Sequence, residues 1–364
     1  MQEVFAGVLE NVRTTADPLT TRICRCACLS DLFGGRKITA FGLSFGYIDC
    51  AASEQGVMVS AAAKEDRMPD KHHLITEISV GDRGAGPYGV TVGPDGALWF
   101  TLVHGGQICR LGPGDDVTTH ALDSAGCGPS IITSGPDGAL WFTRNRDHRI
   151  GRIATDGTST SFATPTRNSG PFGIVAGPDG ALWFTEMNTD IIGRLTDSGE
   201  ITEFPLPVRG AFPSMITAGP DEALWFTLNQ ANAIGRIDLD GTVTLHEVPT
   251  AAAGPVGIAA GADGALWFVE IIAGQVGRVT PDGEIQEFPL PDRAARPHAI
   301  VADPAGGCWF TEWAANRIGH VSPHGAFRHY DLPTPRSEPH GITVALDGAV
   351  WSALEAGAAA RLAF

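Results

Sequence analysis

Two histidines, His298 and His340, stand 42 residues apart, and each follows a proline that is preceded by a charged residue, Arg296 or Glu338. Imidazole exchanges a proton near neutral pH, and a neighbouring carboxylate orients the ring and tunes its pKa, as a general base requires. A single histidine of this kind is usually a solvated or packed side chain. Two at equivalent positions, each beside a charge, favour acid–base chemistry.

Two glutamates extend this cluster towards a metal site. Carboxylates that lie close together repel each other unless a cation lies between them. Glu355 is the candidate partner for Glu338, because it follows the strand that comes next along the chain. Mg²⁺ is commonly held by one or two carboxylates and keeps waters and open positions for substrate. The pair predicts a Mg²⁺ site, and the alternative is that Glu355 is an ordinary surface residue.

A 42-residue repeat must position these side chains. Its marker is a series of tryptophans at constant spacing: Trp99, Trp141, Trp183, Trp225, Trp267, Trp309 and Trp351. A period of about 40–45 residues built from short strands and turns is typical of a β-propeller blade. Each repeat reads as four strands, and the Asp-Gly pair before the strand that carries the tryptophan predicts a hairpin with a primed turn. We therefore predict an all-β, seven-bladed β-propeller with four-stranded blades.

The ends of the repeat array predict how the ring closes. The seventh repeat stops at its third strand, whereas residues 74–78, before the first repeat, match the outer strand at residues 201–204. We expect this N-terminal segment to supply the missing strand of the last blade, which would cover two exposed strand edges. The propeller then spans residues 72–364. Residues 1–70 lack the periodicity, and we expect a weakly ordered appendage or a mis-assigned start.

The repeat also predicts a ring of side chains around one mouth of the central channel. The residue after the proline of each innermost strand recurs every 42 residues: Tyr88, Ser130, Phe172, Ser214, Val256, His298 and His340. The residue before that proline is usually glycine, and Phe212, Arg296 and Glu338 are the exceptions. The ionisable groups thus gather on blades six and seven, where we expect the active site.

Composition narrows the function further. The formal net charge of −16 disfavours binding to phosphate backbones, so nucleic acid is an unexpected partner. We find no apolar run of about 18 residues, and the first residues do not resemble a signal peptide. The seven cysteines lack the spacing of a zinc site or a disulfide framework. We expect a cytoplasmic protein with reduced thiols and no membrane partner.

The repeat phrase Gly-Pro-Asp-Gly-Ala-Leu-Trp-Phe-Thr-Glu, together with residues 295–300 and 338–342, resembles the virginiamycin B lyase (streptogramin B lyase) family. The resemblance covers residues 72–364. It implies a carbon–oxygen lyase that linearises type B streptogramins, which are cyclic depsipeptide antibiotics, by Mg²⁺-assisted elimination at the ester. Antibiotic resistance by a monomeric enzyme acting on a small molecule is the corresponding expectation.

The resemblance also implies roles for individual residues. It implies that His340 is the general base, that His298 and Tyr88 contact the substrate, and that Glu338 and Glu355 are the metal ligands. A metal-dependent propeller lactonase or hydrolase acting on another cyclic ester is one alternative, although it would need more carboxylate or asparagine ligands around the ring. A non-catalytic binding propeller is the other, and it predicts no such cluster of ionisable groups.

Overall fold

The computed structural model describes residues 52–53, 56–57 and 74–364. The chain divides into two units, Met1–Pro69 and Asp70–Phe364. In the first unit, β1 (Ala52–Ser53) pairs with β2 (Gly56–Val57) in an antiparallel ladder. The predicted appendage at residues 1–70 lies almost entirely outside the described residues and stays a prediction. Within the described residues, no helix is long and apolar enough to cross a membrane.

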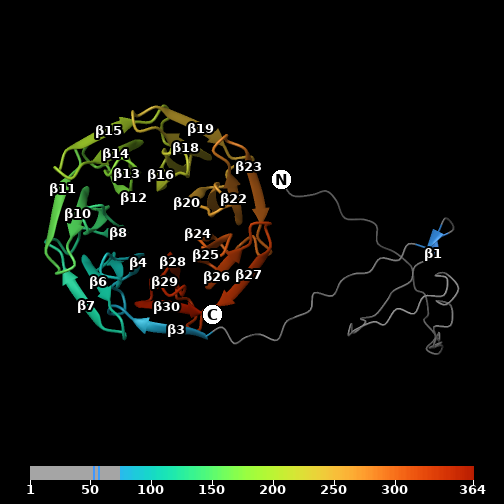
Figure 1. Ribbon diagram of the computed structural model, residues 1–364, viewed down its shortest axis with the longest axis horizontal. Helices are drawn as coiled ribbons and strands as arrows, with labels where there is room; N and C mark the ends of the chain where they lie inside the picture. Colours follow the sequence, from blue (N-terminus) through green and yellow to red (C-terminus); the bar gives the residue numbers. More distant parts are fainter. Residues whose placement is uncertain (1–51, 54–55, 58–73) are drawn as a thin grey trace, which may run out of the picture. The chain divides into compact units, whose positions relative to one another are not determined.

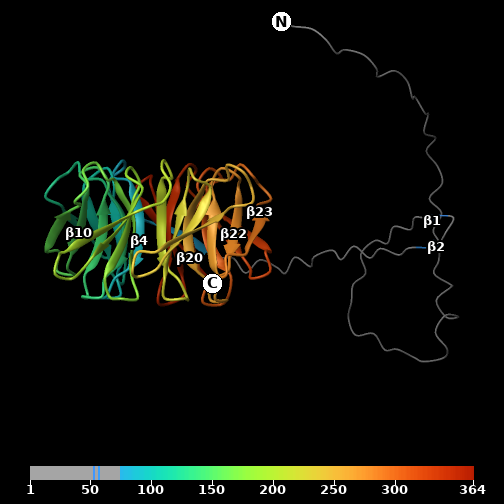
Figure 2. The same cartoon turned by 90° about the horizontal axis from the view of Figure 1, so that it is seen from above.

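Seven four-stranded antiparallel sheets form the second unit, and they stand side by side around a central axis (Figures 1 and 2). The innermost strand of each blade begins at the repeated proline: β4 (Pro87–Val92), β8 (Pro129–Ser134), β12 (Pro171–Ala176), β16 (Pro213–Ala218), β20 (Pro255–Ala260), β24 (Pro297–Ala302) and β28 (Pro339–Val344). The second strand carries the tryptophan: β5 (Leu98–Leu102), β9 (Leu140–Arg144), β13 (Leu182–Glu186), β17 (Leu224–Leu228), β21 (Leu266–Glu270), β25 (Cys308–Glu312) and β29 (Val350–Leu354).

The two remaining strands of each blade lie farther from the axis (Figure 1). The third strands are β6 (Gln107–Leu111), β10 (Arg149–Ile153), β14 (Ile191–Leu195), β18 (Ala233–Ile237), β22 (Gln275–Val279), β26 (Arg317–Val321) and β30 (Ala358–Ala363). The outer strands are β7 (Val117–Ala121), β11 (Ser159–Ala163), β15 (Ile201–Pro205), β19 (Val243–Glu247), β23 (Ile285–Pro289), β27 (Phe327–Asp331) and β3 (Leu74–Ser79). The predicted seven-bladed all-β propeller is confirmed.

The ring closes as the sequence predicts. β3 pairs with β30, so the last sheet has the order β28-β29-β30-β3 and combines strands from both ends of the array. The register joins Ile75 to Leu362 and Glu77 to Ala360. Blade seven therefore has its fourth strand, and the edge of β30 is paired rather than open to another chain.

The turn before each tryptophan strand differs from the expected primed hairpin turn. In blade one, Gly96 donates its N–H to Gly93 O at 2.9 Å, and among the two turn residues Asp95 and Gly96 only Gly96 has a positive φ, 75°. This is a type I turn followed by one left-handed residue, which is the usual three-residue hairpin connection. The predicted hairpin is present, but the turn type expected for it is wrong.

The aspartate of this turn explains why the repeat conserves its spacing to the tryptophan within the chain. Asp95 Oδ1 accepts from Trp99 Nε1 at 3.0 Å, and its other oxygen accepts from Arg110 Nε at 2.7 Å. The same three-residue bond set recurs in blades two to five. Each indole N–H is thereby satisfied although the ring is buried, as buried polar groups require.

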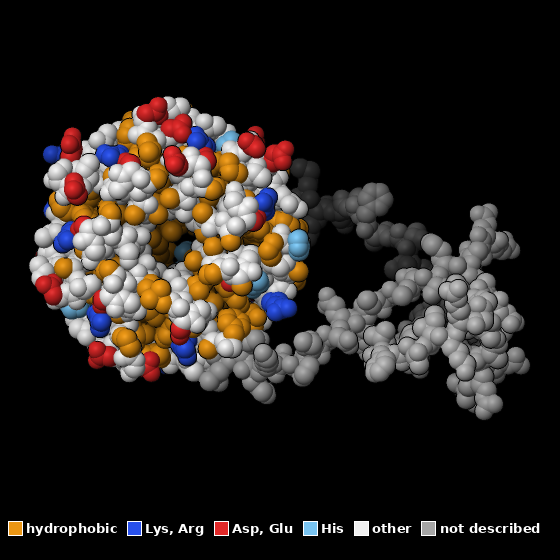
Figure 3. All heavy atoms as spheres, in the orientation of Figure 1, with side chains coloured by type: hydrophobic (Ala, Val, Ile, Leu, Met, Phe, Trp, Pro, Cys, Tyr) orange, Lys and Arg blue, Asp and Glu red, His pale blue; other side chains and the backbone are white. Residues whose placement is uncertain are grey.

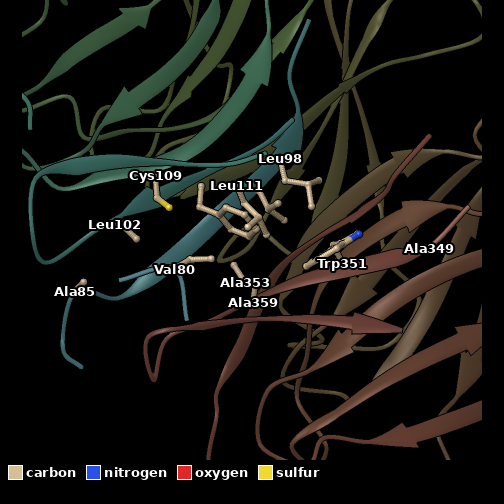
Figure 4. Close-up of a cluster of buried hydrophobic side chains, with 12 residues drawn as sticks. Val80, Ala85, Leu98, Leu102, Cys109, Leu111, Ala349, Trp351, Ala353 and Ala359 are labelled. Atoms are coloured by element: carbon tan, nitrogen blue, oxygen red, sulfur yellow. The ribbon is translucent and has the colours of Figure 1, made fainter. Parts of the chain in front are cut away.

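The core lies between neighbouring blades. Trp99, Trp183 and Trp225 have no exposed surface, and six of the seven blades also bury a phenylalanine next to the tryptophan. Figure 4 shows the apolar cluster at the closing seam, to which blades seven and one both contribute. Its larger members are Leu98, Phe100, Leu102, Leu111 and Trp351. This packing fixes the relative positions of blades seven and one, and both of them carry residues of the site.

Candidate active site

Three aromatic side chains meet at one mouth of the channel. Tyr88, His298 and His340 are the second residues of β4, β24 and β28, in blades one, six and seven. The ring centroids of Tyr88 and His340 are 4.4 Å apart, those of His298 and His340 are 4.8 Å apart, and those of Tyr88 and His298 are 5.8 Å apart. Equivalent positions on adjacent innermost strands thus bring together residues that are up to 252 positions apart in the chain.

Burial sets the protonation of two of these groups. The Tyr88 hydroxyl lies 3.3 Å from His298 Nε2. Burial, followed by the negative charge of Glu355, raises the pKa of Tyr88, so the phenol keeps its proton. Burial, followed by the neighbouring His340, lowers the pKa of His298 to about 3. His298 is therefore a neutral hydrogen-bonding group at physiological pH and not a cation.

Glu355 lies between two histidines. It follows β29 directly, and its Oε2 is 2.6 Å from His340 Nε2 while its Oε1 is 2.9 Å from His104 Nε2. The hydrogen bond from His340, with a further one from His104, lowers the pKa of Glu355 to about 2. The carboxylate is therefore ionised at neutral pH, and it can orient the ring of His340 and stabilise positive charge on it.

Glu338, His340 and Glu355 form a cluster that could hold a cation. Each offers one ligand atom, and these atoms all lie within 4.8 Å of one another. Glu355 N also donates to Glu338 O at 3.1 Å, which ties the two backbones together. Two carboxylates, one of them ionised as shown above, match the oxygen donors that Mg²⁺ takes from proteins. The residues present therefore fit a hard divalent cation, and Glu355 is not an isolated surface residue.

The two histidines of this region each have one ring nitrogen without a partner in the described part of the chain. His298 Nδ1 and His340 Nδ1 are buried and have no hydrogen-bond partner among the described residues. Buried polar atoms normally have a partner in the protein, in water or in a ligand. The pair therefore suits a site that takes a polar ligand.

The residue before each repeated proline has a positive φ in all seven blades. Glycine adopts this conformation without strain and is present in four blades, whereas Phe212, Arg296 and Glu338 hold φ values of 56°, 51° and 53°. A non-glycine residue in the left-handed region costs on the order of 1–3 kcal/mol and persists where function requires the side chain. The strain at Glu338 therefore lies directly at the candidate metal site.

In six of the seven blades, two facing positions share the space beside the mouth, and one of them holds a large side chain while the other holds a small one. In blade one a Cβ at Gly86 would lie 2.5 Å from the side chain of His104, which is 18 residues later. Blades two, three and five repeat this arrangement with a glycine and a large residue. In blades six and seven the order is reversed, because Arg296 and Glu338 face Ala314 and Ala356 in the sequence pattern. A glycine before the proline leaves room for the later side chain, and an alanine at the later position leaves room for the side chain before the proline.

His104 and Arg146 are parts of the site that the sequence analysis missed. They follow the second strands of blades one and two, and Arg146 Nη2 lies 3.4 Å from His104 Nδ1. His104 and Glu355 are 251 residues apart and belong to different repeats, so no local motif joins them. The available signal was positional: both stand five residues after a repeat tryptophan, on the same ring around the mouth.

Other candidates take different places. Arg296 lies over the ring of Trp313, with its guanidinium carbon 5.8 Å from the ring centroid. Glu186, Glu270 and Glu312 are fully buried at the ends of their strands. Their hydrogen bonds go to side chains of their own blades, such as that from Thr189 to Glu186 at 2.9 Å. These glutamates belong to the interior of the blades.

The channel beneath the histidines is apolar. A cavity of about 140 Å³ is lined by Tyr88 and His298 at the mouth and by Ile131, Met215 and Ile258 below it. Figure 3 shows one face of the propeller hollowed at its centre, with hydrophobic side chains around the hollow and most acidic side chains nearer the rim. The polar cluster therefore stands at the edge of a non-polar depression, which is a common form of small-molecule site.

Comparison with known proteins agrees with this geometry. The sequence model of the Virginiamycin B lyase family matches residues 73–362. The chain belongs to this family. The resemblance inferred from the two Pro-His motifs is thus confirmed, and membership places the chain among carbon–oxygen lyases.

Solved structures of the family share the fold at high similarity. The virginiamycin B lyase of Staphylococcus aureus is 43% identical, with a TM-score of 0.77, and the match covers 80% of this chain and 99% of that one. A streptogramin B lyase structure is 42% identical with a TM-score of 0.78, covering 80% and 97%. A catalytically inactive His-to-Ala variant of the Staphylococcus aureus enzyme, solved with quinupristin, is 43% identical with a TM-score of 0.77, covering 80% and 99%.

Curated virginiamycin B lyases match over shorter segments. The protein from Saccharopolyspora erythraea is 64% identical over 50 residues, which are 14% of this chain and 17% of that protein. The protein from Streptomyces coelicolor is 56% identical over 47 residues, which are 13% and 16% respectively.

Proposed function

We propose that this virginiamycin B lyase family member linearises a type B streptogramin, or a closely related cyclic depsipeptide, by elimination at its ester with the assistance of Mg²⁺. The observation that carries the proposal is the cluster of Glu338, His340 and Glu355 beside Tyr88 and His298 at one mouth of the propeller. The relative solved with quinupristin, at 43% identity, supports a small-molecule substrate of this class.

His340 is the proposed general base. Elimination begins with removal of a proton from the carbon next to a carbonyl. The electron pair left behind forms a carbon–carbon double bond, and the bond between carbon and the ester oxygen breaks to release a carboxylate. The ionised Glu355, 2.6 Å from His340 Nε2, orients the imidazole and stabilises the positive charge that it acquires. No water enters the product, so the ring opens without a change in mass.

Tyr88 and His298 are the proposed substrate contacts. The phenol keeps its proton and the imidazole stays neutral, so both act through hydrogen bonds and not through charge. Their hydroxyl and ring nitrogen, 3.3 Å apart, present a polar edge above an apolar channel. Such an edge suits a cyclic peptide that carries carbonyl groups and apolar side chains together.

Glu338 and Glu355 are the proposed ligands of Mg²⁺. A bound divalent cation supplies positive charge that stabilises the negative charge developing on the carbonyl and the leaving carboxylate. The two glutamates and the backbone bond between them are contributed by blade seven alone. His340, which shares the cluster, is kept for proton transfer because Mg²⁺ prefers oxygen ligands.

Covalent catalysis by a serine has no support at this mouth. Ser130 and Ser214 belong to the same ring of residues, but their hydroxyls donate to Gly128 O at 3.1 Å and Phe212 O at 3.3 Å. Each hydroxyl is thus engaged by the backbone of its own blade and has no base beside it in these bonds. An activated nucleophile needs such a base within hydrogen-bond reach.

The proposal is tested by incubating the purified protein with quinupristin and Mg²⁺ and following loss of the cyclic compound by liquid chromatography. We expect conversion to a single ring-opened product, loss of conversion with excess EDTA, and recovery when Mg²⁺ is restored. Conversion that is unaffected by EDTA would contradict the role of the metal. A binding protein without activity would leave quinupristin intact under all three conditions.

A further inference from the structure

We propose that His104 is a positioning residue of the metal site, which holds Oε1 of Glu355 from the neighbouring blade and so directs Oε2 towards the cation position. The inference rests on the proposed function only in that the cluster binds a divalent cation. His104 is contributed by blade one and Glu355 by blade seven, so the contact crosses the seam at which the ring closes.

The neighbouring arginine fixes the tautomer of His104. Arg146 Nη2 lies 3.4 Å from His104 Nδ1, and a guanidinium group only donates hydrogen bonds. The contact assigns Nδ1 as the nitrogen that faces the guanidinium, and Nε2 is then the nitrogen that carries a hydrogen towards Glu355. Nε2 is 2.9 Å from Glu355 Oε1, which is the distance of a direct N–H···O hydrogen bond. The chain Arg146–His104–Glu355 thus has one consistent direction of donation.

The hydrogen bond from His104 restrains the side chain of Glu355, which the backbone bond leaves free to rotate. The bond from Glu355 N to Glu338 O fixes the main chain, but the side chain is 28% exposed and can rotate. His104 occupies Oε1, so Oε2 is the oxygen that faces His340 and the cluster. Second-shell hydrogen bonds of this kind orient ligands, and their loss typically weakens metal affinity about 10–100-fold.

Blade one is built to allow this reach. A Cβ on residue 86 would lie only 2.5 Å from Cδ2 of His104. Gly86 therefore leaves the space that the imidazole occupies. In blade seven the equivalent position before the proline holds Glu338, a predicted ligand. The position before the proline is therefore a glycine in blade one, which makes room for His104, and a glutamate in blade seven.

The bonds of His104 run towards the site and not into the core. Its side chain is 41% exposed, and both of its side-chain hydrogen bonds join it to the mouth residues Glu355 and Arg146. Removing an exposed side chain of this kind changes stability little. A change in metal affinity without a change in melting temperature is therefore the mark of the positioning role.

The test measures Mg²⁺ binding to the full-length protein by isothermal titration calorimetry, without substrate. We expect His104→Ala to raise the Kd for Mg²⁺ about tenfold. His104→Gln should restore most of the affinity, because its amide N–H₂ can donate to Oε1 from a similar reach. Gln230→Ala is the matched control, since Gln230 holds the same repeat position in blade four on the opposite arc, and it should bind as the wild type does.

Arg146 supplies an internal check on the tautomer argument. Arg146→Ala should weaken Mg²⁺ binding less than His104→Ala does. The double variant should bind no more weakly than His104→Ala alone, because both changes act through one chain of bonds. Additive losses would show that Arg146 acts on the site by another route and would contradict the relay.

Activity separates this inference from the proposed function. At saturating Mg²⁺, His104→Ala should recover most of its kcat for quinupristin, and only the Mg²⁺ concentration required should rise. Wild-type Mg²⁺ affinity in His104→Ala, with turnover intact in the unmodified protein, would overturn the positioning role and leave the proposed function standing. Absence of both Mg²⁺ binding and turnover in the unmodified protein would overturn both.

Discussion

At the residue scale, burial and hydrogen bonding set different charges on Glu355 and His298, which are close neighbours in the site. Glu355, with a pKa near 2, stays charged, whereas His298, with a pKa near 3, stays neutral, although both adjoin His340. The difference arises because Glu355 accepts two hydrogen bonds from histidines while His298 is desolvated. Of these two groups, only Glu355 is negative, and it is hydrogen-bonded to the base.

His340→Ala tests the base directly. Removing a general base typically lowers the rate about 10²–10⁴-fold, and we expect kcat to fall by at least 100-fold. His340 lies at the mouth, where its ring contacts Tyr88 and His298 rather than the apolar clusters of the core, so the melting temperature and circular dichroism should change little. Initial rates with quinupristin at saturating Mg²⁺ measure the effect. A kcat close to that of the unmodified protein would remove His340 from this role.

Prediction from sequence reached most of this site and missed its outer part. His298, His340 and Glu338 could be found because they break a repeat at defined positions. Glu355 could be proposed as the partner of Glu338 because it follows the tryptophan strand of the same blade. His104 could not be found in this way, since its contact with Glu355 spans 251 residues and depends on two blades meeting at the seam.

At the element scale, each blade is a unit whose interior tolerates polar groups only when they are paired or neutral. Glu186 ends β13 with no exposed surface. Burial, followed by the charge of Glu203, raises its pKa to about 8, and the bond from Thr189 only partly offsets this. The blade therefore holds a protonated carboxyl at neutral pH, which makes its stability depend on pH.

Glu186→Gln should stabilise the propeller increasingly as the pH rises. The folded pKa is raised above the ordinary glutamate value near 4.5, so this residue contributes stability below that value and loses it progressively as the pH rises through about 8. The variant carries no such proton. Its melting temperature relative to wild type should therefore increase between pH 5 and pH 8.5 in thermal unfolding.

The control for this pH series is Glu200→Gln, which changes an exposed glutamate of the same blade. Its difference from wild type should stay nearly constant across the range. Parallel pH profiles for Glu186→Gln and wild type would show that the buried carboxyl has an ordinary pKa.

The backbone conformation of Glu338, the residue before β28, predicts that a glycine there would favour stability and abolish metal binding. Its φ of 53° is one that glycine adopts without strain, and four other blades have glycine there. Glu338→Gly should keep or raise the free energy of unfolding, by about 1 kcal/mol, while abolishing Mg²⁺ binding. Denaturant titration and calorimetry measure the two effects. A destabilised variant that still binds Mg²⁺ would contradict both parts of this assignment.

The turns illustrate what a repeat pattern leaves open at this scale. The Asp-Gly pairs correctly marked the hairpins, but they did not distinguish a two-residue primed turn from the three-residue connection that is present. In the connection that is present, Trp99 Nε1 donates to Asp95 Oδ1, and Gly96 rather than the aspartate is the left-handed residue. That contact appears only when the tryptophan is placed beside the turn.

At the scale of the whole propeller, closure and function depend on the same seam. β3 completes blade seven by pairing with β30, and the apolar cluster beside it joins blade seven to blade one. The seam also brings His104 to Glu355. The sequence predicted the closing strand because the array lacked one outer strand and residues 74–78 matched its pattern.

Deletion of residues 1–79 should therefore damage both the fold and the site. The edge of β30 would be unpaired, and we expect a clearly lower melting temperature, a tendency to aggregate and loss of Mg²⁺ binding. Deletion of residues 1–69 is the matched control, because it leaves β3 intact and should preserve both properties. Equal behaviour of the two truncated proteins in thermal unfolding and calorimetry would contradict the role of β3.

The central claim is that the site opens a cyclic ester by elimination. The most direct measurement is mass spectrometry of the product formed from quinupristin and Mg²⁺ in water enriched in ¹⁸O. The account predicts a ring-opened product with the mass of the substrate and no ¹⁸O in the released carboxylate. A product that has gained one water and carries the label would show hydrolysis and contradict the account.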